Sequence, residues 1–138
     1  MKSVNQKTGA TSVPAKFATS ELNRDGLKIK VLRSSLGARV LWSGISDNRE
    51  PGPFLDPWLA ELAETLTNTP MVIDFRDMEF MNSATFHSVN VAMRRLDQCN
   101  APIKVLYRQD IAWQRVSFRC LRVIAASQMP NIKVTSEP

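Results

Sequence analysis

Residues 71–75, MVIDF, form an apolar run of strand length that lies between two stretches with helical spacing. Such a run is typical of an interior strand covered on both faces. Apolar residues mark one helix face before it, at Leu55, Leu59, Leu62, Ala63 and Leu66. They mark another after it, at Phe86, Val89, Ala92, Met93 and Leu96. A buried strand between two amphipathic helices predicts an α/β fold.

The remaining elements are predicted from the two-residue alternation of strands, from apolar runs of strand length and from helical spacing. Alternation predicts a hairpin of strands at 27–33 and 38–44, and apolar runs predict strands at 101–107 and 131–134. Asp56 and Pro57 predict the start of the first helix, which should end before Pro70. Residues 76–81 are interpreted as a loop, and the second helix should run from Ser83 to about Cys99. The pattern predicts a mixed sheet of four to five strands with helices packed against it.

The last helix is expected over 110–127. Its predicted apolar side consists of Trp113, Val116, Cys120 and Ile124. Arg115, Arg119 and Arg122 form a stripe opposite, which suits either a solvated helix face or a site for phosphate groups. Trp42, Trp58 and Trp113 all fall on elements with an apolar face, which favours core packing over base stacking.

The chain of 138 residues suits one domain. Residues 1–24 show no sustained period and are interpreted as a flexible extension, which leaves 25–138 as the domain. No window approaches the roughly 18 apolar residues of a membrane-spanning helix, and the first residues lack the apolar centre of a secretory signal. We therefore expect no membrane insertion and a cytoplasmic location.

The net charge of +5 is unevenly distributed. The first 24 residues and residues 94–122 are basic, whereas residues 47–79 are acidic. This polarity fits docking to a charged protein surface at least as well as binding along a phosphate backbone. Nucleic-acid binding through the basic extension and the arginine stripe stays open as the less favoured alternative.

Few catalytic or cofactor sites are compatible with the sequence. All five glycines precede residue 53, so no strand-to-helix turn of the later part can be a glycine-rich phosphate loop. Cys99 and Cys120 lie outside any C-x-x-C pattern and predict neither a disulfide framework nor a zinc site. Ser83 and His87, the only histidine, lack an evident third catalytic group. We expect a protein that is not an enzyme and has no cofactor.

Three carboxylates, Asp74, Asp77 and Glu79, are candidate metal ligands, because oxygen ligands suit divalent ions. They follow one another along a strand end, where alternation separates side chains. A group of loop carboxylates is the favoured interpretation, and no metal site is predicted.

One segment resembles a known motif. PMVIDFRDMEFMNSATF, residues 70–86, resembles the signature of STAS domains, the fold of bacterial anti-sigma factor antagonists, in which a strand, a short loop and Asp-Ser-Ser-Gly open a helix. It is most similar to a STAS-like subgroup with the motif Phe-Leu-Asn-Ser-Ser-Gly and a downstream Trp-Gln-x-x-Ser-Leu segment. MEFMNS at 78–83 and WQRVSF at 113–118 fit that form. The resemblance runs over residues 38–134, about 70% of the chain.

This resemblance implies a STAS-like sandwich and a non-enzymatic regulator in a bacterial partner-switching system. The partner implied is a serine kinase or anti-sigma-type protein, and a serine phosphatase would reverse the kinase. Ser83 aligns with the phosphorylated serine, and Thr85 is the second candidate. Asn82 replaces the more common Asp, and Ala84 and Thr85 replace Ser and Gly.

The implied switch has a simple physical basis. Ser83 should lie at or next to the cap of a helix, where the helix dipole tolerates negative charge. A phosphate adds about −1.5 to −2 charge, which a partner packed on it would have to desolvate. The expected partner-binding residues are Asn82, Ser83, Thr85, His87, Asn90 and Arg94. Three alternatives stay open: a plain helix cap, a STAS module that binds without phosphorylation as a transporter accessory or scaffold, and the nucleic-acid-binding domain.

Overall fold

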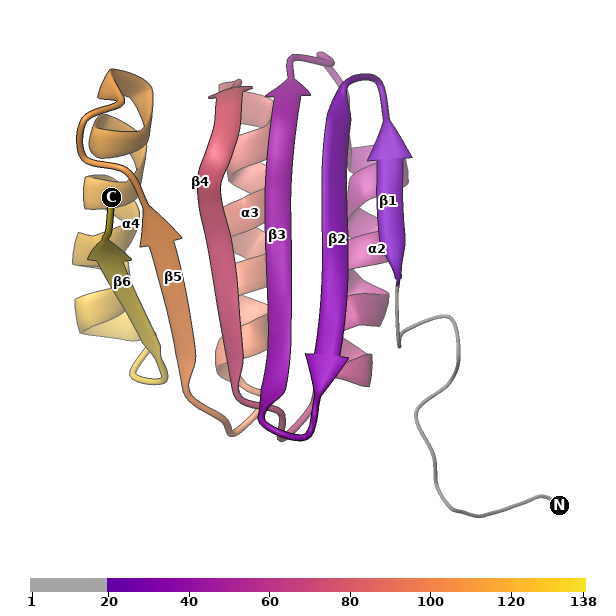
Figure 1. Ribbon diagram of the computed structural model, residues 1–138, viewed down its shortest axis with the longest axis vertical. Coiled ribbons are helices and arrows are strands. Elements are labelled where there is room, and N and C mark those ends of the chain that lie inside the picture. Colours follow the sequence, from indigo (N-terminus) through magenta and orange to yellow (C-terminus); the bar gives the residue numbers. More distant parts are fainter. Residues whose placement is uncertain (1–19) are drawn as a thin grey trace, which may run out of the picture.

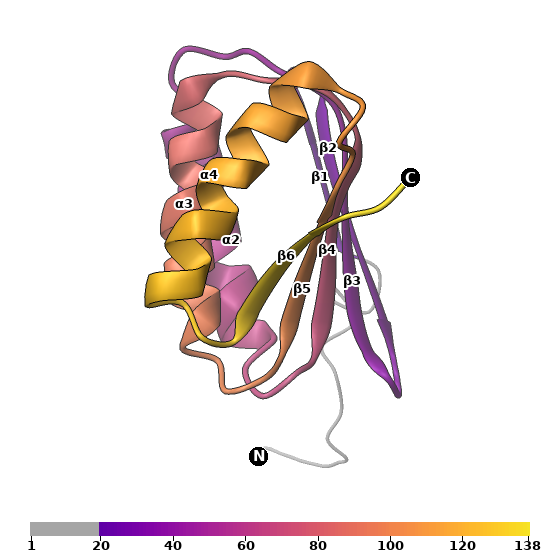
Figure 2. The same cartoon turned by 90° about the vertical axis from the view of Figure 1, so that its left-hand side faces the viewer.

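The computed structural model describes residues 20–138, which form one sheet covered on one face by three helices (Figures 1 and 2). The strands are β1 (Glu21–Arg24), β2 (Leu27–Ser34), β3 (Gly37–Ser46), β4 (Met71–Met81), β5 (Ile103–Tyr107) and β6 (Ile132–Ser136). The helices are α2 (Gly52–Thr65), α3 (Ser83–Asp97) and α4 (Ala112–Gln128). The predicted mixed α/β architecture is confirmed.

The six strands lie in the order β1-β2-β3-β4-β5-β6. The first three pair antiparallel and the last four pair parallel, so the strands from β3 onward begin at one end of the sheet and end at the other. The sheet has one strand more than expected because Glu21–Arg24, which the sequence places in the extension, pairs with β2. The rest of the expected extension, residues 1–19, lies outside the described residues.

Helix α2 begins earlier than the sequence predicts. The carbonyl of Pro51 accepts hydrogen bonds from the amides of Phe54 and Leu55, so a helical turn already exists before Asp56. Pro57 lies inside the helix instead of at its first position. The prediction of Asp56 as the cap is therefore wrong, whereas the end before Pro70 is confirmed.

Helix α4 faces the sheet with a different stripe from the predicted one. Its buried residues are Gln114, Phe118, Leu121 and Ala125, whereas Val116 is 69% exposed and Cys120 lies at the surface. Both stripes have helical spacing, so periodicity alone does not separate them. Aromatic packing determines which stripe is buried, because Phe118 contacts the rings of Phe75 and Tyr107 with centroids 4.8 and 5.6 Å apart.

Strand β4 continues through residues 76–81, which the sequence assigns to a loop. It pairs with β3 as far as Met81, with register shifts along the way, but pairs with β5 only from Met71 to Asp74. The second half of β4 therefore has a strand neighbour on one side only. Hydrogen-bonding groups on its other edge need partners from elsewhere in the fold.

Candidate functional site

The C-terminal end of β4 leads directly into α3 through Asn82, which caps the helix. Its Oδ1 accepts hydrogen bonds from the backbone amide of Thr85 at 2.9 Å and from the Thr85 hydroxyl at 2.7 Å. Its Nδ2 donates to the carbonyl oxygen of Asn48 at 2.8 Å. An amide side chain can both accept and donate, which a carboxylate at this position cannot do. Asn82 thus joins the helix start to the loop before α2.

Thr85 lies inside this cap and is fully buried. Its hydroxyl is 2.6 Å from the hydroxyl of Ser46, at the end of β3. Because the single Thr85 hydroxyl proton goes to Asn82, the Ser46 hydroxyl acts as the donor between the two. The amide of Asn82 also donates to the carbonyl of Ser46 at 2.9 Å. The end of β3 and the start of α3 are held together by this buried network.

Ser83 is the first residue of α3 and its side chain is exposed. The sequence predicts Ser83 either at the helix cap or next to it. The side chain of Asn82 makes the capping hydrogen bonds, so Ser83 lies next to the cap. The first N–H groups of a helix have no carbonyl partner within the helix, and they carry the partial positive charge of the helix dipole. An exposed hydroxyl therefore lies beside an electropositive helix end.

The exposed side of α3 brings most of the expected partner-binding residues together. Ser83, His87 and Arg94 are exposed, and Asn82 and Asn90 are half-buried. Asn90 donates to the carbonyl of Phe86 within the helix, and Arg94 donates to Oε1 of Gln128 on α4. Thr85 does not share this surface because its side chain is buried.

Val91 lies on the same side of α3 and is 46% exposed. Val91 falls outside the apolar face predicted for this helix, so it is not among the partner-binding residues expected from the sequence. The signal was present, since Val91 stands four residues after His87 and three before Arg94, at the spacing of one helix side. We define the α3 surface as Ser83, His87, Asn90, Val91 and Arg94.

Two side chains of α4 satisfy the free edge of β4. Gln114 is fully buried, and its Nε2 donates to the carbonyls of Phe75 at 3.0 Å and Met78 at 2.9 Å. Its Oε1 accepts from the amide of Arg108 at 2.8 Å. Trp113 donates from Nε1 to the carbonyl of Glu79 at 2.7 Å. These side chains occupy the place of the missing strand partner and hold the part of β4 that leads to Asn82.

These contacts give the Trp-Gln dipeptide a structural role that was not predicted from the sequence. A buried glutamine is rare and needs hydrogen-bond partners for both ends of its amide. No periodicity marks such a position, because its partners are backbone groups. The only available signal was the dipeptide within WQRVSF itself.

The three carboxylates considered as metal ligands, Asp74, Asp77 and Glu79, all lie on strand β4 and not in a loop. Among residues 20–138 no group of three or more His, Cys, Asp or Glu side chains is arranged to hold a metal ion. Asp74 instead accepts from the Arg76 guanidinium at 2.9 and 2.7 Å. Burial acts to raise the pKa of Asp74, but the hydrogen bonds from Arg76 and the charges of Arg76 and Arg39 outweigh it and lower that pKa.

The arginine stripe of α4 is only partly available to a ligand. Arg115 is half-buried and donates to the carbonyl of Gln109 at 2.8 Å, whereas Arg119 and Arg122 are exposed. Val116 and Val123, which are 69% and 71% exposed, lie on the adjacent part of the helix surface. This mixture of apolar and basic side chains resembles a protein-contact surface more than a continuous phosphate-binding track.

Comparison with known proteins gives a match of structure. No protein-family model matches the sequence, and no curated protein matches it significantly. An anti-sigma factor antagonist from Mycobacterium paratuberculosis matches with a TM-score of 0.56 at 16% identity, over 80% of this chain and 88% of that chain. The anti-sigma factor antagonist SpoIIAA in its unphosphorylated form matches with a TM-score of 0.50 at 14% identity, over 79% and 89% of the two chains.

The fold is therefore that of the STAS domain, as in the anti-sigma factor antagonists, and the STAS-like fold expected from the sequence is confirmed. None of the described helices is long and apolar enough to cross a membrane.

Proposed function

We propose that the chain is a non-enzymatic STAS-type regulator in a bacterial partner-switching system, controlled by phosphorylation of Ser83. Unmodified, it binds a serine kinase or anti-sigma-type partner through the α3 surface. Phosphorylation by the kinase releases the partner, and a serine phosphatase restores binding.

One observation carries this proposal. Ser83 is exposed at the first position of α3, while every capping hydrogen bond is made by Asn82. A kinase can therefore modify the Ser83 hydroxyl without breaking the cap. The phosphate is also tolerated by the fold, because it lies at the positive end of the helix dipole.

Thr85 is a poorer acceptor than Ser83. Its hydroxyl is buried and joins Ser46 to Asn82, so its phosphorylation would require the start of α3 to open. A buried polar network of this kind is costly to disrupt. We assign the modification to Ser83 and a structural role to Thr85.

The switch would act on the partner and leave the fold intact. The α3 surface combines the apolar Val91 with the polar Ser83, His87 and Arg94, a mixture suited to a protein interface. A dianion on Ser83 would have to lose its water when a partner packs there. Association is then disfavoured while the domain stays folded.

The test uses purified serine kinases with an ATPase-like domain from the source organism. Each is incubated with the protein and ATP, and mass spectrometry locates the phosphate. We expect a single site at Ser83, which Ser83→Ala abolishes. In equilibrium binding, Ser83→Glu should weaken the partner's affinity, and Ser35→Glu, an exposed serine in the hairpin between β2 and β3, is the matched control.

The outcome separates this proposal from the related binding module. If Ser83→Glu binds every partner as tightly as the parent chain, the switch is refuted and a phosphorylation-independent STAS module, such as a transporter accessory or scaffold, is favoured. If the phosphate is found on Thr85, the assignment of the acceptor is refuted although the regulatory role stands.

A further inference from the structure

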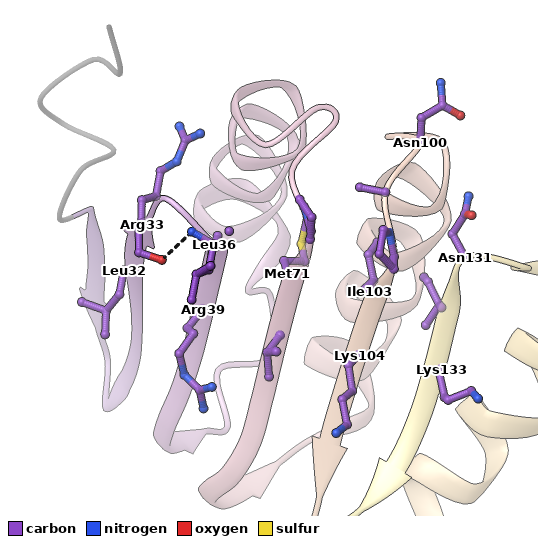
Figure 3. A pocket seen from close by; sticks show the side chains of 18 of the residues that line it. Leu32, Arg33, Leu36, Arg39, Met71, Asn100, Ile103, Lys104, Asn131 and Lys133 are labelled. Carbon is purple, nitrogen blue, oxygen red and sulfur yellow. Dashed lines mark hydrogen bonds between the residues drawn. The ribbon is translucent and has the colours of Figure 1, made fainter.

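A cavity of about 850 Å³ lies at the opposite end of the sheet from Ser83. It is formed where β3, β4, β5 and β6 begin, and the hairpin between β2 and β3 closes one side (Figure 3). Gly37 packs so closely against the Pro70 carbonyl that a side chain at this position would clash with it. A volume of this size falls within the range of small-molecule sites.

The charges that line this cavity are all of one sign. Arg33, Arg39, Lys104 and Lys133 line it, and no Asp or Glu does. Apolar side chains, including Leu32, form much of the remaining wall. A surface of this composition complements a molecule with an anionic group and an apolar body.

Strand register explains how the cations come together. Arg39 pairs with Val72, Val72 with Lys104, and Lys104 with Lys133, so these four residues form one straight row across β3, β4, β5 and β6. Alternating burial along these strands places the four side chains on the sheet face opposite the buried one. The helices do not cover that face (Figure 2), and Figure 3 shows Arg39, Lys104 and Lys133. With strands about 4.8 Å apart, Arg39 and Lys104 flank Val72 at a backbone separation of about 10 Å.

The pairing of Lys104 with Lys133 is unfavourable by itself. Like charges directly opposite each other on adjacent strands destabilise a sheet. Glu137 offsets the repulsion at Lys104, because its carboxylate lies 3.0 Å from the Lys104 Nζ. Lys133 has no ion-pair partner among the described residues. A bound anion would compensate both lysines at once.

We propose that this cavity binds a small amphipathic anion, a carboxylate or phosphate head on an apolar body. The head contacts Lys104 and Lys133, and the apolar body lies along Val72 towards Leu32. The chain's own first 19 residues do not complement the cavity, since they contain Lys2, Lys7 and Lys16 and no acidic residue. This binding is separate from the proposed partner switch, because it uses the other end of the strands.

The test measures the fluorescence of anilinonaphthalene sulfonate, an amphipathic anion, on titration with the full chain. We expect saturable binding at one site, displaced by decanoate or by decyl phosphate. The more effective competitor identifies whether the head is a carboxylate or a phosphate. Inorganic pyrophosphate supplies charge alone and 1-octanol supplies an apolar body alone, so neither should displace the probe at comparable concentration.

Substitutions locate the site. Lys104→Gln/Lys133→Gln should weaken binding roughly tenfold or more, because two charge-assisted contacts are lost. Lys28→Gln/Lys30→Gln removes the same charge from the same sheet face outside the cavity and should change the affinity by less than about twofold, since exposed distant charges are screened. Glu137→Gln releases Lys104 and should strengthen binding.

Several results would overturn the proposal. Absence of saturable binding, or equal binding by the two double variants, excludes an anion site in this cavity. Displacement by pyrophosphate but not by decanoate points to a free phosphate, and displacement by octanol alone points to an apolar site. Displacement by an oligoglutamate peptide but not by decanoate points to an acidic segment of a protein partner. Circular dichroism confirms that each variant is folded.

Discussion

At the scale of single residues, the start of α3 is held by hydroxyl and amide groups in which each hydrogen-bond donor has an acceptor. Thr85 donates to Asn82 and accepts from Ser46, so each group in the cap is satisfied. Thr85→Val keeps the side-chain shape but leaves the buried Ser46 hydroxyl without its acceptor. We expect the free energy of unfolding to fall by about 1–3 kcal/mol, the usual cost of a buried unsatisfied group.

Urea denaturation of Thr85→Val measures this change, with the exposed Thr67→Val as the matched control. In the double variant Ser46→Ala/Thr85→Val both hydroxyls are absent, so the loss should be smaller than the sum of the two single losses. Strict additivity would contradict the proposed coupling between these residues.

Asp74 gives a second prediction at this scale. Its pKa in the folded state lies below its ordinary value, so the folded protein releases this proton more readily than the unfolded chain. The resulting stabilisation is fully present above the unfolded pKa of about 4 and is lost as the pH falls through the lowered folded pKa. Asp74→Asn should therefore cost about 1 kcal/mol at pH 7, since it breaks a partly buried charged contact with Arg76.

The difference between Asp74→Asn and the parent chain should shrink as the pH is lowered below about 4. Thermal unfolding at several pH values measures it. Asp110→Asn is the control, because Asp110 pairs with Arg108 at an exposed position where solvent screens the interaction. A difference that grows towards low pH would contradict the assigned direction of the Asp74 pKa.

At the scale of elements, α4 serves as a substitute strand partner for the second half of β4. Gln114→Leu keeps a similar volume but leaves the carbonyls of Phe75 and Met78 and the amide of Arg108 without their side-chain partner. We expect a loss of about 2–4 kcal/mol in the free energy of unfolding, since several buried groups become unsatisfied together.

Chemical denaturation checks this loss, and the exposed Gln109→Leu provides the control. Hydrogen exchange adds a local readout, because the backbone of 75–81 should lose protection in Gln114→Leu. Unchanged stability and unchanged protection would show that the Gln114 contacts do not hold this half of β4.

Elements with a side-chain period could be predicted from the sequence, and those fixed by backbone contacts could not. The alternation in β2 and the apolar face of α3 are local patterns, and both were predicted. In β1 only Leu22 is half-buried, and the strand is held by backbone pairing with β2, so no side-chain pattern marks it. The buried face of α4 depended on where Phe75 and Tyr107 lie, which is tertiary information.

The candidate site follows the same division. The position of Ser83 beside a helix cap follows from the strand-to-helix boundary, which periodicity predicts. The burial of Thr85 depends on Ser46, 39 residues away in the chain, and no local pattern reports that contact. Val91 was not predicted, because a lone exposed valine lies outside the apolar stripe that helical periodicity marks.

At the scale of the whole molecule, the fold separates two surfaces. The C-terminal end of β4 presents Ser83 and the α3 surface, and the start of the same strand contributes Met71 and Val72 to the basic cavity. All three helices lie on one face of the sheet (Figure 2), so α3 and α4 both offer exposed apolar residues to a partner on that side. These are Val91 on α3 and Val116 and Val123 on α4.

Binding measurements on two variants show which of these two helices forms the partner interface. Val91→Asp places a charge within the α3 surface and should weaken binding of the proposed kinase or anti-sigma-type partner about tenfold or more, since a charge at the centre of an interface must be desolvated. Val123→Asp makes the same change on α4 and should alter the affinity by no more than about twofold. Isothermal titration calorimetry measures both, and unfolding curves confirm that both variants fold. Weakening by Val123→Asp alone would move the interface to α4 and separate it from Ser83, because a partner bound there would not contact the phosphate.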